Sequence, residues 1–114
     1  MNAETHDFKL QRAGPQVVVA MPAEIDIGNA DQVRRALLSA MEPQVTVLIV
    51  DMSRTTFCDS AGVQAVIAAY RQAATTGTQL RLVATEVLRI FTVIGTDQLI
   101  PVYPTVEAAQ AEMS

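Results

Sequence analysis

The feature that most constrains this chain is an uninterrupted apolar run, Val47-Leu48-Ile49-Val50, within residues 45–51. A short run of this kind, rich in β-branched residues and without polar alternation, is typical of a strand that is buried on both faces. Its length is that of a strand and is too short for most helices. We therefore predict that residues 45–51 form the central strand of a sheet.

Other segments around this run follow the periods of strands and helices. Residues 7–12 and 17–21 flank the turn signal Gly14-Pro15 and predict a hairpin. Further strands are predicted at 79–84 and 101–103. A first helix is predicted from Asn29, with Gln32 in a capping-box position, to Pro43, and a second at 60–74. A third is predicted at 86–94, with Val87, Ile90, Phe91 and Ile94 inward. A fourth is predicted to start at Thr105, with Val106, Ala109 and Met113 inward.

The predicted order is ββαβαβαβα, an α/β fold with a mixed, mostly parallel sheet of about five strands and about four helices. We expect residues 1–114 to form a single domain. Binding sites in such folds tend to lie at the carboxyl ends of the strands. Residues 52–59, which are predicted to be a loop, follow the central strand at such an end.

Composition excludes several classes of function. The formal net charge is −4 and the eight Lys and Arg residues are scattered, so nucleic-acid binding is not expected. The start of the chain lacks a basic and apolar leader, and no apolar stretch approaches the ~20 residues that cross a bilayer. We therefore expect a soluble, cytoplasmic protein that does not bind membranes.

Catalytic and metal chemistry is also not expected. The chain has one cysteine, Cys58, and one histidine, His6, which lies in the polar N-terminal segment. No catalytic triad or thiolate metal cluster can be built from them, and no Gly-rich phosphate loop is present. Cys58 is more simply a small apolar residue. We predict an interaction protein, not an enzyme, without a metal or cofactor.

The segment Phe57-Cys58-Asp59-Ser60-Ala61-Gly62 joins the predicted loop to a helix. Ser60 is a favoured N-cap residue, and a cap is the simplest interpretation of it. The free N–H groups of a helix start also tolerate an anion, so a phosphate on Ser60 is chemically permitted. Gly62 has no Cβ and could let a backbone or a phosphate approach closely.

Residues 51–62 resemble the signature of STAS domains in anti-sigma factor antagonists, in which a strand ends in Asp-Leu-Ser and Asp-Ser-Ser/Ala-Gly opens a helix. Residues 23–26, Ala-Glu-Ile-Asp, look like the family's Gly-Glu-Leu-Asp, and residues 87–106 resemble its third helix and Pro-Val-Tyr strand. Ala23 departs from the usual Gly and would be strained at a positive φ. Ala61 replaces a frequent second Ser, which leaves Ser60 as the hydroxyl of this motif.

The resemblance implies a partner switch. The unphosphorylated form would bind a serine-kinase anti-sigma factor and so release a sigma factor. Phosphorylation of Ser60 by the kinase would end binding, and a PP2C-type phosphatase would reverse the modification. The implied partner-binding residues are Glu24, Asp26, Thr55, Thr56, Asp59, Ser60, Ala61 and Gly62.

Several alternatives stay open at this point. Asp26 could orient Ser60 or simply form a turn, and Thr55 and Thr56 are more simply loop hydroxyls bonded to nearby backbone. The chain could instead be a STAS subunit of a lipid-transport or stress-signalling assembly that docks a partner without a phosphorylation switch. A pocket around Ser60 that takes a nucleotide or another small molecule is a third hypothesis. A homodimer is compatible with the sequence.

Overall fold

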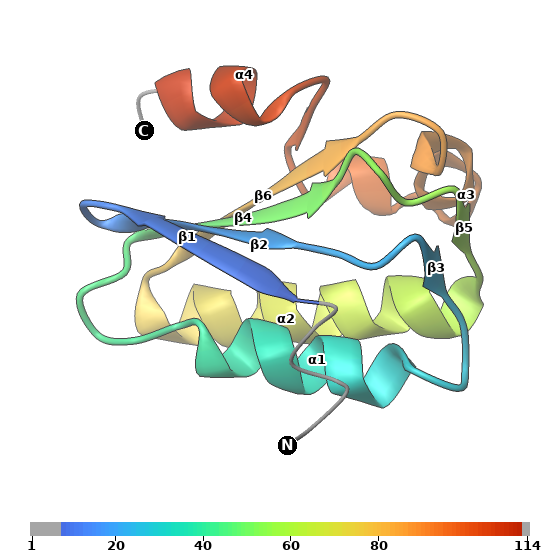
Figure 1. Ribbon diagram of the computed structural model, residues 1–114, viewed down its shortest axis with the longest axis horizontal. Helices are drawn as coiled ribbons and strands as arrows, with labels where there is room; N and C mark the ends of the chain where they lie inside the picture. The colour runs from blue at the N-terminus through green and yellow to red at the C-terminus, as the bar shows by residue number, and fades with distance from the viewer. Residues whose placement is uncertain (1–7, 113–114) are drawn as a thin grey trace.

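The computed structural model describes residues 8–112, apart from the side chain of Asp97, and contains a five-stranded sheet in the order β1-β2-β4-β6-β7 (Figure 1). Strand β1 runs antiparallel to β2, and all other neighbours in this sheet are parallel. The strands are β1 (Lys9–Ala13), β2 (Gln16–Ala20), β4 (Val47–Met52), β6 (Gln79–Ala84) and β7 (Val102–Tyr103). The predicted class, the mixed sheet and the hairpin at its start are confirmed.

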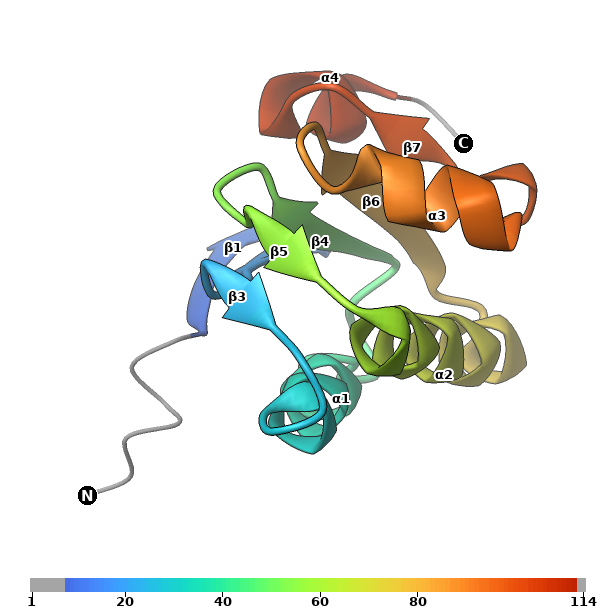
Figure 2. The same cartoon turned by 90° about the vertical axis from the view of Figure 1, so that its right-hand side faces the viewer.

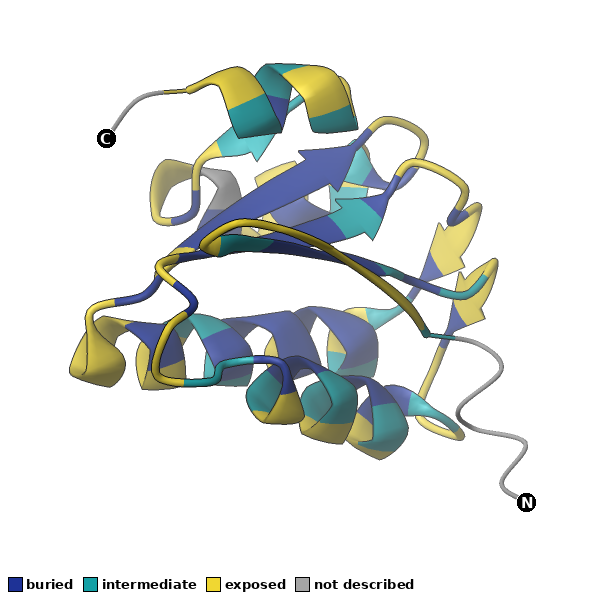
Figure 3. Cartoon of the chain, turned by 60° about the vertical axis from the view of Figure 1, so that its left-hand side comes forward, coloured by how far each residue is buried: buried dark blue, intermediate teal, exposed yellow. Residues whose placement is uncertain are grey.

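The apolar run 47–50 lies in β4, the central strand, as predicted. Alternate residues of β4 enter two different cores, and the middle strands of the sheet are mostly dark blue, the colour of buried residues, in Figure 3. Leu48 and Val50 pack with the apolar residues of the helices below the sheet, whereas Val47 and Ile49 pack with Ala109 above it. Because both sides of the strand exclude water, a polar residue on either side would lose hydration, and this explains why the run has no alternation.

Two helices, α1 (Ala30–Ser39) and α2 (Ser60–Thr76), lie under one face of the sheet, which we call the helical face (Figure 1). α3 (Leu88–Ile94) adds Phe91 to the same core. α4 (Val106–Ala111) packs on the opposite face, the α4 face, where the fully buried Arg81 donates to the carbonyl oxygen of Ala109 at 2.7 Å. The four helices and five strands of the main sheet have the predicted order.

The predicted loop 52–59 contains structure that the prediction missed. Phe57–Cys58 forms a short strand, β5, which pairs in parallel with β3 (Glu24–Ile25) in a separate two-stranded sheet. A short 3₁₀ helix, η2 (Thr96–Gln98), was also not predicted. Strands of two residues are too short to produce a recognisable period, so this sheet could not be read from the sequence.

Asn29 is the N-cap residue of α1, as predicted, but the predicted capping box does not form. Asn29 precedes the helix, but its side chain makes no capping bond. Instead its amide reaches back to the segment before the helix, where it donates to the carbonyl oxygen of Glu24 at 2.9 Å and accepts from the N–H of Asp26 at 2.9 Å. Gln32 therefore has no reciprocal partner in a capping box.

Other local predictions have mixed outcomes. Thr105 caps α4 as expected, since its hydroxyl accepts from the N–H of Ala108 at 3.0 Å. Ile94, predicted to be inward, is exposed, because α3 ends there and Gly95 turns the chain with φ of 91°. Ala23 is not strained, since no described residue other than glycine has a positive φ. The interpretations of Asp7, His6 and Met113 fall outside the described residues.

Replacement of Leu48 by Ala tests the role of β4. Leu48 is fully buried in the main core, so the cavity that its loss leaves should lower the free energy of unfolding by about 2–5 kcal/mol. Leu99, which is half exposed, is the matched control and should lose less than about 1 kcal/mol on the same change. Urea unfolding followed by circular dichroism measures both. Equal losses in the two variants would contradict the assignment of β4 as the core strand.

Candidate functional site

The two-stranded sheet β3–β5 stands at the end of the molecule towards which the parallel strands point (Figures 1 and 2). Glu24 lies opposite Phe57 and Ile25 opposite Cys58, and the N–H of Asp59 donates to the carbonyl oxygen of Ile25 at 3.1 Å. Because the strands are parallel, the residues that follow them leave from the same edge. The sheet therefore brings residues 24–27 beside residues 57–60, which are more than 30 positions later.

Asp59, and not Ser60, caps helix α2. The carboxylate of Asp59 accepts a hydrogen bond from the N–H of Gly62 at 3.1 Å, and the backbone of Asp59 is extended. Ser60 is the first residue of the helix and is exposed to solvent. The prediction that Ser60 is the N-cap is wrong, because the pairing of β5 fixes the extended conformation one residue earlier. The Ser60 hydroxyl is accordingly not needed for the cap.

Gly62 is buried where α2 passes behind the two short strands. A Cβ at this position would lie 2.6 Å from Sγ of Cys58, 2.7 Å from Cγ2 of Ile25 and 3.3 Å from its Cβ. These distances are shorter than van der Waals contact, so only glycine fits without displacement of its neighbours. The expected close approach to Gly62 is thus made by side chains of β3 and β5, and not by a backbone or a phosphate.

The two acidic residues of the 23–26 segment are exposed. Oδ1 of Asp26 accepts from the N–H of Gly28 at 2.8 Å, and its carbonyl oxygen accepts from the N–H of Ala30 at 2.8 Å. Asp26 thus forms the turn before α1, which was the simpler of its two interpretations. Glu24 stands beside Phe57 in the strand register. Together with Asp59, these carboxylates make the edge next to Ser60 acidic.

The two threonines before β5 differ in exposure. Thr55 is fully buried, and its hydroxyl donates to the carbonyl oxygen of Pro22 at 2.8 Å. It can therefore support the site but cannot touch a partner, which corrects its inclusion among partner-binding residues. Thr56 is exposed, and its N–H donates to the carbonyl oxygen of Ala23 at 2.8 Å. Both threonines fasten the segment before β5 to the segment before β3. Ala61 is half-buried beside Ser60.

Cys58 is buried between α2 and the two short strands. Burial, assisted by the nearby negative charge of Asp59, raises the pKa of its thiol to about 11. At neutral pH the sulfur is therefore a neutral thiol, and a poor nucleophile. Within residues 8–112 no group of three or more His, Cys, Asp or Glu side chains could hold a metal ion, and no helix of that segment is long and apolar enough to span a membrane.

Large exposed apolar side chains lie on β5, on the turn before α1 and on α3, and no sequence pattern marked them. Ile27 is 85% exposed, Phe57 is 50% exposed and Val93 of α3 is 74% exposed. Phe57 and Val93 line a shallow groove of about 400 Å³ between β5 and α3. Large exposed apolar side chains that gather near one another are typical of surfaces that bind proteins. Once β5 is known, Phe57 can be identified as an outward-facing residue, because successive residues of a strand face opposite sides and Cys58 is buried.

The Gly62→Ala variant tests the packing of α2 on the short strands. Alanine gains roughly 1 kcal/mol in helix propensity, but the overlap with Ile25 and Cys58 should outweigh it and give a net loss of about 1–3 kcal/mol. Adding Cys58→Ala removes the nearest atom and should recover part of that loss, as a double-mutant cycle in thermal unfolding would measure. Additive losses would contradict direct contact. Gln64→Ala, on the exposed side of α2, is the control.

Two substitutions at Asp59 separate capping from charge. Asp59→Ala removes the acceptor for the Gly62 N–H and should cost about 1 kcal/mol of unfolding free energy. Asp59→Asn keeps an acceptor oxygen and should stay within a few tenths of a kcal/mol of the unmodified protein. Urea unfolding at neutral pH measures both. If the Asn variant loses as much as the Ala variant, then charge rather than hydrogen bonding accounts for the effect.

Comparison with known proteins identifies the fold and the family of the chain. The chain is 24% identical to an anti-sigma factor antagonist from Mycobacterium paratuberculosis, with a TM-score of 0.78 and coverage of 90% of this chain and 89% of the other. It is 23% identical to the anti-sigma factor antagonist SpoIIAA in its unphosphorylated form (TM-score 0.68, coverage 90% and 93%) and 24% identical to the Bacillus protein SpoIIAA in its phosphorylated form (TM-score 0.67, coverage 90% and 96%).

These likenesses show a shared fold. A search of curated proteins gave no match. The family model for the STAS domain matches residues 7–109, nearly the whole chain, and it covers every residue of the site described above. The resemblance noted from residues 51–62 is thereby confirmed, and the chain belongs to the STAS domain family.

Proposed function

We propose that this protein is an anti-sigma factor antagonist in which Ser60 is the phosphorylated residue. The observation that carries the proposal is the position of Ser60: it is exposed at the first residue of α2, while the neighbouring Asp59 makes the helix cap. A hydroxyl that stabilises nothing else can be modified without loss of a structural bond. The solved antagonists with this fold include one in both unphosphorylated and phosphorylated forms, which supports the proposal.

The surroundings of Ser60 are suited to binding a protein. Ile27, Phe57 and Val93 offer exposed apolar area, and the acidic residues Glu24 and Asp26 border it. Buried apolar anchors with a polar rim are the usual composition of an interface centre. In the unphosphorylated state a partner could cover Ser60 with little loss of free energy, because one hydrogen bond to water or to the partner replaces the hydration of a neutral hydroxyl.

A phosphate at Ser60 would change the charge of this surface. It adds roughly −1.5 to −2 charge at neutral pH. One N–H of the first turn of α2, that of Gly62, is already bonded to the Asp59 carboxylate. The added dianion would therefore stand beside Asp59 and the carboxylates of the β3 edge, where it repels them and needs hydration. Docking of an apolar partner would bury that charge, so phosphorylation opposes binding while the domain stays folded.

The reaction cycle then has two further participants. A serine-kinase anti-sigma factor would both bind this surface and phosphorylate Ser60, and a PP2C-type phosphatase would return the protein to its binding form. Binding of the kinase by the unphosphorylated protein would free a sigma factor. In this scheme the chain supplies a switchable surface and performs no catalysis.

The test uses each serine-kinase anti-sigma factor encoded by the source genome, purified and incubated with this protein and ATP. We expect one kinase to bind the protein and to add a single phosphate, mapped to Ser60 by mass spectrometry. Ser60→Ala should bind that kinase within about twofold of the unmodified protein and accept no phosphate. Ser60→Asp should bind at least about tenfold more weakly, which corresponds to about 1.4 kcal/mol.

Matched controls separate charge from shape. Ser60→Asn has the size of the Asp variant without its charge and should bind more tightly than it. Ser39→Asp adds the same charge at the last residue of α1. Because α1 begins near the site and is ten residues long, Ser39 lies at its far end, and this variant should not weaken binding. Phosphate on another residue, or equal affinity of the Ser60→Asp variant and the unmodified protein, would reject the proposal.

A further inference from the structure

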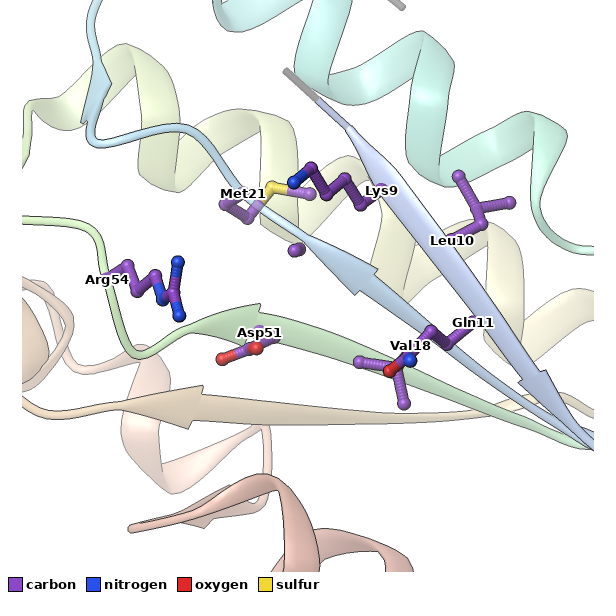
Figure 4. Close-up of a pocket in the computed structure, with 8 residues that line it drawn as sticks. Lys9, Leu10, Gln11, Val18, Met21, Asp51 and Arg54 are labelled. Atoms are coloured by element: carbon purple, nitrogen blue, oxygen red, sulfur yellow. The ribbon is translucent and has the colours of Figure 1, made fainter. Parts of the chain in front are cut away.

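A second hollow lies on the α4 face of the sheet, away from the groove between β5 and α3. It has a volume of about 460 Å³, within the range of small-molecule sites. Strands β1, β2 and β4 form its floor and one wall, and the chain after β4 forms the other wall (Figure 4). Its lining residues are Lys9, Leu10, Gln11, Val18, Ala20, Met21, Asp51 and Arg54.

The strand register explains why the sheet is hollow here. Lys9, Ala20 and Asp51 are direct neighbours across three strands, and Gln11 and Val18 form the adjacent pair. Ala20 contributes only a methyl group between two longer polar side chains. α4 packs on Val18, Val47, Ile49 and Val83 of this face but does not line the hollow. The result is a trough with polar side chains on its rim and an apolar floor.

In the described part of the chain the two cations of the rim, Lys9 and Arg54, are not held in ion pairs. By contrast, Arg12 pairs with Glu42 and Arg34 with Asp31. Figure 4 shows the Arg54 side chain extending from the chain after β4 over the hollow, on the side of Asp51. An arginine and a lysine that border one hollow attract an anionic oxygen group, which the guanidinium can bind with two parallel hydrogen bonds.

Asp51 and Gln11 restrict the ligand further. Oδ1 of Asp51 accepts from the N–H of Ser53 at 3.0 Å, which orients the half-buried carboxylate beside Ala20. A carboxylate at this place repels a bare anion but accepts a hydrogen bond from a ligand hydroxyl or amine. The apolar floor of Val18 and Ala20 suits a small ring or alkyl body. The polar rim and the apolar floor of the hollow thus match different parts of one molecule.

We propose that this hollow binds a small organic anion, a carboxylate or a phosphate monoester, with its charged group between Lys9 and Arg54 and its apolar body over Ala20. The proposal does not depend on the phosphorylation of Ser60, because none of the residues that line the hollow belongs to the segment from Thr56 to Gly62. It assigns a ligand site to a face of the domain that the partner switch does not use.

The test is a titration of the ¹⁵N-labelled full chain with phenyl phosphate, benzoate and inorganic phosphate, followed by amide chemical shifts. We expect saturable shifts at Lys9, Gln11, Ala20, Asp51 and Arg54 with at least one aromatic anion. Saturation by phenyl phosphate alone identifies a phosphate ester, and saturation by benzoate alone identifies a carboxylate. Inorganic phosphate, which lacks the apolar body, should bind at least tenfold more weakly than the better aromatic anion.

Three variants make the result specific. Arg54→Gln and Lys9→Gln should each weaken binding at least fivefold, whereas Arg89→Gln, an exposed arginine of α3, should not change it. Ala20→Leu keeps the charge but fills the trough and should abolish binding, with a spectrum that shows the fold intact. The proposal is overturned if no aromatic anion saturates, if inorganic phosphate binds equally well, or if Ala20→Leu or Arg54→Gln binds like the unmodified protein.

Discussion

The arrangement of the site depends on one missing side chain, the Cβ of residue 62. Because Gly62 has none, helix α2 approaches Ile25 and Cys58 closely enough for its first turn to touch both short strands. That contact holds β3 against β5 and sets the point at which the helix begins. Asp59 then falls at the cap and Ser60 one residue later, facing solvent. A bulkier residue at 62 would separate the helix from the strands and move the hydroxyl that the proposed switch uses.

Charge and packing have separate roles around this contact. The Asp59 carboxylate accepts from the Gly62 N–H at the helix start, so a phosphate on Ser60 would place its charge beside an existing negative charge. Ile27 and Phe57 are exposed, and Phe57 faces outward because it alternates in β5 with the buried Cys58. In the proposed switch, a partner can therefore dock on the apolar surface of the unphosphorylated protein. Once Ser60 carries a phosphate, docking would have to bury a dianion, and this opposes binding.

Much of the fold was predictable because it depends on patterns of four or more residues. The run 47–50 marks the central strand, and Gly77 and Gly95 end their helices in the left-handed conformation. The site was less predictable. Asp59 and Ser60 are both favoured caps, and only the pairing of β5 decides between them. The burial of Thr55 likewise follows from its bond to Pro22, which is 33 residues earlier and leaves no local pattern.

The pairing of β3 with β5 joins parts of the chain that are 33 residues apart, and it needs the β4 crossover to be in place. Such long-range contacts form late, because the chain loses the entropy of closing the intervening loop before the contacts can stabilise it. The conformation that presents Ser60 is therefore absent from a chain that is still being synthesised or is unfolded. An enzyme that recognised this edge would require the completed tertiary structure, so unfolded or nascent copies would not be modified at Ser60.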